Sequence, residues 1–348
     1  MSGLLELRNV TKVFGGGIFS KNRTTALEDL SFTLDTDQPS ITSIVGESGS
    51  GKTTVARLLL GMIAPTKGHI FYKGNDVAEM SRVERKEFRR EVQPIFQDPF
   101  EVFNPFYKVD HVLKVPISKF KLAGSEGEER SMISDALEMV GLRPDETLGR
   151  YPHQLSGGQR QRIMVARSLL LKPRVILADE PVSMVDASLR ATILESIHKL
   201  NRELGISILY ITHDLTTAYQ ISDNILVLYR GSVAEGGSVE AVIKDPKHPY
   251  TQLLVGSIPQ PNPDLTWSEG RTSVVPVANR VVTGCKFADR CDSVMDLCWN
   301  NVPPRYQLDR YRVAACHLFR DSPVMTGSDV SQVFAARTEM SMQTPSGK

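Results

Sequence analysis

The sequence predicts an α/β fold around a parallel sheet, with an inserted helical region and a small C-terminal extension. Short apolar runs rich in Ile and Val alternate with helical patterns, which is typical of strand–helix–strand units. Residues 55–62 carry apolar side chains at i, i+3, i+4 and i+7, as one face of a helix requires. The buried strands are expected at residues 41–45, 175–178, 206–211 and 225–228.

The chain of 348 residues is longer than a single hydrophobic core usually serves, so we expect a large domain with a smaller one appended. The main domain is predicted at residues 1–235, with a helical subdomain at about 97–160 that contains no convincing strand. The proportion of Pro and polar residues rises after residue 235, which indicates an extension at 236–320. Residues 321–348 lack periodicity, and we expect this tail to be disordered.

The charge of the chain is nearly balanced, with 41 Lys and Arg residues against 40 Asp and Glu residues. A net charge of +1 gives no electrostatic sign of nucleic-acid binding, and we expect no nucleic-acid partner. The N-terminus lacks the basic-then-apolar pattern of a signal peptide. No apolar run approaches the roughly 20 residues of a membrane-spanning helix. We therefore expect a cytosolic protein that reaches a membrane only through a partner.

Residues 46–53 read Gly-Glu-Ser-Gly-Ser-Gly-Lys-Thr, which fits the phosphate-loop pattern G-x-x-x-x-G-K-[ST]. Glycines let backbone N–H groups point at phosphate oxygens, and the following helix directs its positive end there. Lys52 is expected to neutralise the β- and γ-phosphates, and the Thr53 hydroxyl to bind Mg²⁺. A Gly-rich turn could match by accident, but the strand before it and the helix after it favour ATP binding. The expected nucleotide-binding residues are Gly46, Ser48, Gly49, Ser50, Gly51, Lys52, Thr53 and Thr54.

Residues 175–180 form an apolar run that ends in two carboxylates, Asp179 and Glu180. A buried strand that delivers an Asp at its C-terminal end holds Mg²⁺ in phosphate-loop ATPases. A Glu in the next position can orient and polarise the attacking water. Two solvated acids at a strand end are the alternative, which would prevail without a phosphate loop. Beside that loop we expect Asp179 to bind Mg²⁺ and Glu180 to be catalytic.

Residues 155–159 read Leu-Ser-Gly-Gly-Gln. Ser156 and Gln159 predict a capping box at the start of a helix. Gly157 and Gly158 leave backbone N–H groups accessible to a phosphate. This pentapeptide resembles the signature of the ABC ATPase family, and the resemblance covers about residues 4–320. It implies a RecA-like phosphate-loop NTPase fold, the ABC cassette, with Ser156, Gly157 and Gly158 in a nucleotide site.

The resemblance implies four further site residues. Phe14 matches the aromatic residue that stacks on adenine, with an ordinary core Phe as the alternative. Gln97 matches the glutamine that senses Mg²⁺ and the water and contacts the transmembrane partner. Asp186 matches the D-loop aspartate, although Ser-Met-Val-Asp at 183–186 departs from the usual Ser-Ala-Leu-Asp. His213 matches the histidine that contacts the γ-phosphate, where a lone His at a strand end would otherwise be structural.

The chain has one phosphate loop and one signature. In the family these face each other only across two cassettes, so the resemblance implies a dimer. DNA-repair members carry a long coiled coil, translation factors carry two cassettes, and exporters commonly include a membrane domain. The sequence shows none of these features. An importer ATPase or an unfused exporter ATPase remains.

The C-terminal part resembles the extension of the oligopeptide/dipeptide importer branch, through His-Pro-Tyr-Thr-Gln-Leu-Leu at 248–254 and Ile-Pro at 258–259. Residues 104–105 and 151–154 are also similar to that branch. The implied partners are a homologous ATPase subunit in a heterodimer or homodimer, two transmembrane permease subunits and, indirectly, an extracytoplasmic solute-binding protein. The implied location is peripheral, on the cytoplasmic face of the inner membrane. Peptides are the expected solute, with oligosaccharides or nickel as alternatives.

The four cysteines of the chain all fall in one segment, at Cys285, Cys291, Cys298 and Cys316. Disulfides are not expected in the cytosol, and the C-x₂₋₄-C pairs of structural zinc sites are absent. Four thiolates could hold a [4Fe–4S] cluster, and the extension of this branch resembles the arrangement. Zinc and four buried structural cysteines remain alternatives. We expect a structural role for the cluster.

Overall fold

The computed structural model divides into two compact units, the first formed by Met1–Ala78 with Thr212–Lys348 and the second by Glu79–Ile211. The residues that the structure describes are 3–15, 23–35, 37–98, 103–183, 185, 187–258 and 282–334.

The first unit contains an antiparallel sheet and a second run of paired strands. Its strands are β1 (Leu5–Gly15), β2 (Arg23–Leu34), β3 (Ile41–Val45), β4 (Lys67–Tyr72), β5 (Asn75–Asp76), β9 (Asn224–Tyr229), β10 (Ser232–Ser238), β11 (Tyr306–Asp309) and β12 (Arg312–Ala314). The antiparallel sheet has the order β2–β1–β4–β5, and the second run has the order β11–β12–β10–β9–β3. Only β3 and β9 pair in parallel within that run.

Short helices accompany these strands. They are α1 (Lys52–Leu59), α9 (Leu215–Ile221), α10 (Val239–Lys244), α11 (Pro249–Gly256) and α12 (Asp296–Asn300), with 3₁₀ turns η2 (Ala288–Arg290), η3 (His317–Phe319) and η4 (Val330–Val333). Every residue of β3 and β9 is buried, as apolar runs in a covered sheet should be. The strand predictions at 41–45 and 225–228 are therefore confirmed.

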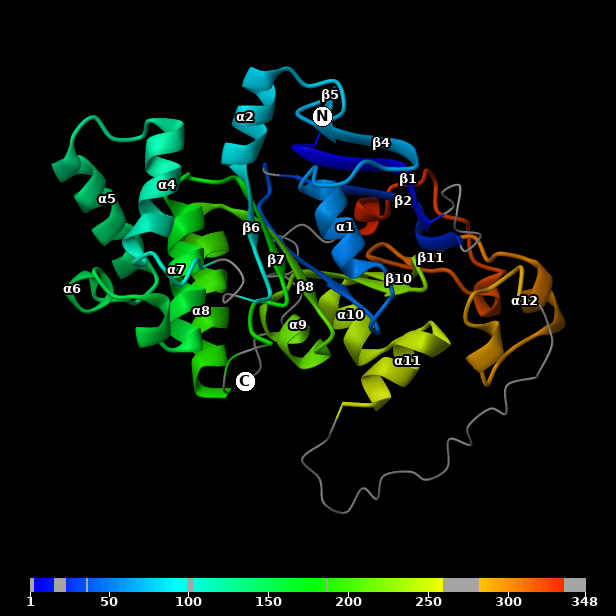
Figure 1. Ribbon diagram of the computed structural model, residues 1–348. Coiled ribbons are helices and arrows are strands. Elements are labelled where there is room, and N and C mark those ends of the chain that lie inside the picture. The colour runs from blue at the N-terminus through cyan, green and yellow to red at the C-terminus, as the bar shows by residue number, and fades with distance from the viewer. Residues whose placement is uncertain are drawn as a thin grey trace, which may run out of the picture. The chain divides into compact units, whose positions relative to one another are not determined.

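The second unit combines three parallel strands with a group of helices (Figure 1). Its elements are α2 (Arg82–Glu91), β6 (Val92–Ile95), α4 (Asp110–Phe120), α5 (Glu126–Met139), α6 (Pro144–Thr147), η1 (Pro152–Gln154), α7 (Gly157–Leu169), β7 (Val175–Asp179), α8 (Ala187–Leu204) and β8 (Ser207–Thr212). Helices α4, α5 and α7 pack against one another. Within the described part of 97–154 there is no strand, as predicted, and β7 and β8 match the expected strands.

The predicted disorder of the tail is wrong for residues 321–334. Val324 forms a bridge with Tyr306, and Asp329 forms one with Ser31. Met325, Val330 and Val333 of this stretch are buried, so apolar contacts as well as these bridges hold it against the rest of the first unit. Residues 335–348 lie outside the described part of the chain.

The boundary predicted between residues 235 and 236 falls inside a strand. Glu235, Gly236 and Gly237 of β10 pair with β12, whose residues belong to the predicted extension. Residues of the extension therefore extend the strand pairing of the first unit and lie in the same compact unit. Among the described helices, none is long and apolar enough to cross a membrane.

Candidate functional site

The phosphate loop follows β3 and leads into α1, and two of its glycines are required by space. Gly46 has φ of 150°, and a Cβ there would lie 2.2 Å from the Leu228 carbonyl oxygen. Gly51, the N-cap of α1, has φ of 107°, and a Cβ would lie 2.5 Å from the Ala26 carbonyl oxygen. A side chain at either position would displace backbone atoms, so only glycine fits at these two positions of the motif.

Lys52 and Ser50 are polar residues buried inside this loop. The Lys52 ammonium donates to the Gly46 and Glu47 carbonyl oxygens at 2.7 and 3.0 Å, which holds the side chain across the loop. Ser50 is 3% exposed, and its hydroxyl has no hydrogen-bond partner in the structure. A buried hydroxyl without a partner costs free energy unless a ligand satisfies it. Thr53, at the start of α1, is exposed and accessible to a metal-bound ligand.

In the second unit, β7 ends at Asp179 and the chain turns sharply at Glu180. Glu180 has φ of 46°, a left-handed conformation that non-glycine residues rarely adopt. Its N–H donates to the Ile211 carbonyl at 2.8 Å, and its carboxylate accepts from the Gln97 amide at 3.1 Å. Strained residues held by such bonds cluster at functional sites. The structure thus brings together Gln97 and Glu180, two of the predicted catalytic residues.

The signature opens α7 with the predicted capping box. The Ser156 hydroxyl accepts from the Gln159 N–H at 3.2 Å, and the Gln159 side-chain oxygen accepts from the Ser156 N–H at 2.9 Å. Arg160 donates twice to the Leu155 carbonyl, which fixes the turn before the helix. Gly157 and Gly158 occupy the first helical turn, whose N–H groups have no intrahelical acceptors. This helix start can therefore receive an anion.

The remaining predicted residues fall in different places. Phe14 lies near the end of β1 and is 41% exposed, with the Lys12 ammonium 5.1 Å from its ring, so the interpretation as a core residue is wrong. His213 follows β8 and is exposed. The structure assigns Phe14, the phosphate loop and His213 to the first unit, and the other described site residues to the second. Asp186 lies outside the described residues.

The segment that carries the cysteines folds beside β9, β10 and α11. Cys291, Cys298 and Cys316 are buried, and Cys285 is half-buried. Burial raises the pKa of Cys291 to about 11 and that of Cys316 to about 12, and the other three cysteines each disfavour the Cys316 thiolate. Cys285 packs in one apolar cluster with Cys291 and in another with Cys298. Even so, no three Cys, His, Asp or Glu side chains of the described residues meet closely enough to hold a metal ion.

Sequence reasoning missed a contact between this segment and the phosphate loop. The Arg290 guanidinium donates to both carboxylate oxygens of Glu47, at 2.8 and 2.9 Å. The hydrogen bond from Arg290 lowers the pKa of the Glu47 carboxyl. The Tyr250 hydroxyl accepts from the Glu47 N–H at 2.8 Å. The only sequence signal was a Glu inside a phosphate-binding loop, where a negative charge needs compensation.

Two buried titratable groups meet at the start of α11. The Glu235 carboxylate accepts from the Lys247 and His248 N–H groups, and the His248 ring accepts from the Tyr250 N–H. Burial raises the pKa of Glu235 to about 7 and lowers the pKa of His248 to about 4. Glu235 therefore adds stability as the pH falls from 7 toward 4.5. His248 removes stability as the pH falls from 6.5 toward 4.

Substituting Glu235 or His248 should leave the pH dependence of stability that comes from the other group without its opposing contribution. Between pH 6.5 and 4.5 each group changes the free energy of unfolding by up to about 3 kcal/mol, and the two changes have opposite signs. Glu235→Gln should therefore lose stability on acidification more steeply than the unmodified chain. His248→Asn, which keeps a capping side chain, should lose less or gain. Urea unfolding at pH 6.5, 5.5 and 4.5 measures the slopes, and one common slope in all three chains would contradict the assignment.

Comparisons with known proteins match the motifs in both units. A family model described as ABC transporter matches residues 27–183, and one described as oligopeptide/dipeptide transporter, C-terminal region, matches residues 234–298. The dipeptide transport ATP-binding protein DppF of Haemophilus influenzae is 38% identical over 303 residues, 86% of this chain and 91% of that protein. The chain belongs to the ABC transporter family, as an ATP-binding subunit of the oligopeptide/dipeptide type.

Other relatives agree with this assignment. A protein of Sinorhizobium fredii described as "Probable peptide ABC transporter ATP-binding protein y4tS" is 37% identical to this ATP-binding subunit over 324 residues, 90% of each chain. A dimeric ATP-binding cassette solved in a post-hydrolysis state with ADP and Pi is 29% identical, with a TM-score of 0.60. That match covers 68% of the subunit and 98% of the cassette. The α/β phosphate-loop NTPase fold is confirmed, and the subunit is an ABC ATPase whose hydrolysis of ATP is coupled to transport.

Proposed function

We propose that this chain drives the import of peptides by hydrolysing ATP beneath a pair of permease subunits. The observation that carries the proposal is the presence, in one chain, of a complete phosphate loop and the oligopeptide/dipeptide C-terminal region. The relatives named above are described as peptide or dipeptide transport proteins, which favours peptides over oligosaccharides or nickel.

The residue roles follow the family pattern. Gly46, Ser48, Gly49, Ser50, Gly51, Lys52, Thr53 and Thr54 bind the phosphates, while Phe14 stacks on the adenine. Thr53, Asp179 and Gln97 would hold a Mg²⁺ ion, which would neutralise charge on the phosphates. Glu180 activates the attacking water, supported by Gln97 and His213. The hydrogen bond from Gln97 to Glu180 and the unpaired Ser50 hydroxyl support these roles.

The chain works as one half of an ATPase pair. Ser156, Gly157, Gly158 and Asp186 complete the nucleotide site of the opposing subunit, which is a homologous chain or a second copy. The open helix start at Ser156 suits a phosphate from another subunit. The pair lies on the cytoplasmic face of the inner membrane, against two permease subunits, and an extracytoplasmic binding protein delivers the solute.

ATP-driven uptake by the whole transporter tests the solute class. The chain, its partner ATPase and both permeases are reconstituted in proteoliposomes with the binding protein on one side and ATP on the other. We expect labelled peptides to accumulate only when ATP is hydrolysed. Accumulation of an oligosaccharide or of nickel, with no peptide uptake, would overturn the peptide assignment. A transporter that carries Lys52→Ala in this chain is the control, and it measures any uptake that does not depend on ATP binding by this chain.

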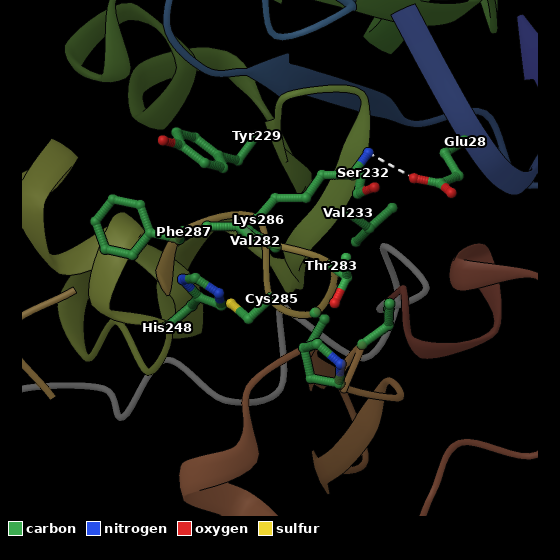
Figure 2. A pocket seen from close by; sticks show the side chains of 15 residues that line it. Glu28, Tyr229, Ser232, Val233, His248, Val282, Thr283, Cys285, Lys286 and Phe287 are labelled. Carbon is green, nitrogen blue, oxygen red and sulfur yellow. Dashed lines mark ion pairs between the residues drawn. The ribbon is translucent and has the colours of Figure 1, made fainter. Parts of the chain in front are cut away.

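We infer further that Cys285, Cys291, Cys298 and Cys316 hold a [4Fe–4S] cluster. The confinement of all four cysteines of the chain to one segment supports it, as does the packing of Cys285 in one cluster with Cys291 and in another with Cys298. Of the four, only Cys285 lines the neighbouring cavity of about 270 Å³ (Figure 2). Binding would require the thiols to draw closer than they lie here. The cluster would cross-link a segment with a small core of its own.

Metal analysis after anaerobic purification tests the cluster. The protein should be brown and contain about four irons per chain. Replacing any one of the four cysteines with Ser should remove the iron and loosen the C-terminal segment. One equivalent of zinc in a colourless protein would assign the site to zinc. A protein without metal would leave four buried structural cysteines as the explanation.

A further inference from the structure

The first turn of the phosphate loop is held by two side chains from the C-terminal part of the chain. The Tyr250 hydroxyl accepts the Glu47 N–H at 2.8 Å, and Tyr250 is fully buried. The Arg290 guanidinium donates two parallel hydrogen bonds, of 2.8 and 2.9 Å, to the Glu47 carboxylate. Such a bidentate pair fixes orientation as well as charge. A residue of the loop thus takes its conformation from a segment 243 positions away in the chain.

Arg290 is itself held in place by aromatic rings. Its guanidinium carbon lies 5.7 Å from the Tyr229 ring centre and 5.6 Å from that of Phe287. The rings of Tyr229, Tyr250 and Phe287 lie 4.5 to 5.5 Å apart, in tilted and edge-on contacts. Cation–π contacts of this kind favour Arg over a shorter or neutral side chain. Arg290 also directly precedes Cys291, so its backbone belongs to the cysteine segment.

Ion pairs join the same segment to the turn between β9 and β10. Arg230 pairs with Asp289 at 3.0 Å, and the Lys286 ammonium donates to the Arg230 carbonyl at 2.8 Å. Lys286 also pairs with Glu28 at 2.6 Å (Figure 2). The turn continues to the phosphate loop, because the Gly231 N–H donates to the Ser50 carbonyl at 2.8 Å. Residues 285–291 are therefore linked to the loop in two ways, directly by Arg290 and Glu47 and indirectly by the turn at residues 230–231.

The charge on Glu47 explains why this contact matters for ATP. The phosphates of ATP carry several negative charges, and the loop that receives them bears a carboxylate at its second position. A carboxylate without a partner would repel the phosphates. Paired with Arg290, Glu47 contributes almost no net charge. Since both side chains are about 40% exposed, salt should screen the repulsion that follows when Arg290 is removed.

We propose that Arg290 is a positioning residue for ATP binding, through which the cysteine segment neutralises the Glu47 carboxylate at the start of the phosphate loop. The proposal rests on the proposed role of that loop in binding ATP. It makes the integrity of the segment around Cys285 and Cys291 a determinant of nucleotide affinity, and so links the C-terminal extension to the ATPase cycle.

Charge rescue in the full-length chain tests the proposal. ATP affinity is measured by calorimetric titration for the unmodified chain and for Arg290→Gln, Glu47→Gln and the double variant. Arg290→Gln should weaken ATP binding about tenfold at low salt, as expected for one uncompensated charge near the phosphates. The deficit should shrink as salt is raised. The double variant should bind within about threefold of the unmodified chain, because neither charge remains.

Three controls make the outcome decisive. Arg320→Gln removes an exposed arginine from the same extension and should leave affinity unchanged. Thermal unfolding shows whether each variant remains folded, and a folded double variant as weak as Arg290→Gln would refute charge compensation. Unchanged affinity in Arg290→Gln would overturn the proposal outright. Lys52→Ala addresses the loop itself: an unmodified chain that binds ATP no better than Lys52→Ala would overturn the phosphate-loop assignment and the proposal with it.

Discussion

Glu180→Gln is expected to slow ATP hydrolysis by at least about 100-fold while leaving ATP binding intact. The amide has the shape of the carboxylate and can still accept the hydrogen bond from Gln97, so the turn at φ of 46° should survive. It cannot take a proton from the attacking water. The loss should therefore fall on turnover and not on affinity.

The measurement compares steady-state ATPase activity of the assembled transporter with ATP affinity of the purified chain. Lys52→Ala is the matched contrast, because it removes the charge that we propose holds the phosphates and should weaken affinity itself. Near-normal turnover in Glu180→Gln would exclude Glu180 as the catalytic base. A folded Glu180→Gln that no longer binds ATP would show that the carboxylate supports the site and not the chemistry.

The sequence predicted the elements whose signals are local. Five consecutive apolar or small residues before Gly46 form a fully buried strand, and the Ser-x-x-Gln spacing at 156–159 forms the capping box. Gly46 and Gly51 of the phosphate loop are part of a recognisable motif, and their positions allow no side chain. A short stretch of sequence is enough to indicate each of these features, although the atoms that exclude a side chain at Gly46 and Gly51 belong to Leu228 and Ala26.

One local signal was misread. The helix expected through Met62 ends at Leu59, and Gly61 adopts a left-handed φ of 63° just beyond it.

Other features depend on residues far apart in the chain. The pairing of β10 with β12 and the order in residues 321–334 arise from partners distant in sequence. The contact of Arg290 with Glu47 spans 243 positions, and no periodicity or motif indicates it. Long-range pairs of this kind need the folded structure.

The central claim is that each ATP is hydrolysed between two subunits, one providing the phosphate loop and the other the signature. Ser156→Arg tests it, because a long cation at the N-cap of α7 would fill the space in front of the open N–H groups. The measurement is vanadate trapping of labelled nucleotide in the assembled transporter, followed by separation of the two ATPase subunits. Trapped nucleotide reports hydrolysis at the phosphate loop of the subunit that carries the label.

With Ser156→Arg in this chain, we predict that labelled nucleotide disappears from the partner subunit, while this chain still binds ATP through its own phosphate loop. The double variant Lys52→Ala and Ser156→Arg should then lose trapping at both sites, although the partner is unmodified. If the double variant loses trapping only on this chain, the signature acts on the ATP of its own subunit. That result would contradict the shared site.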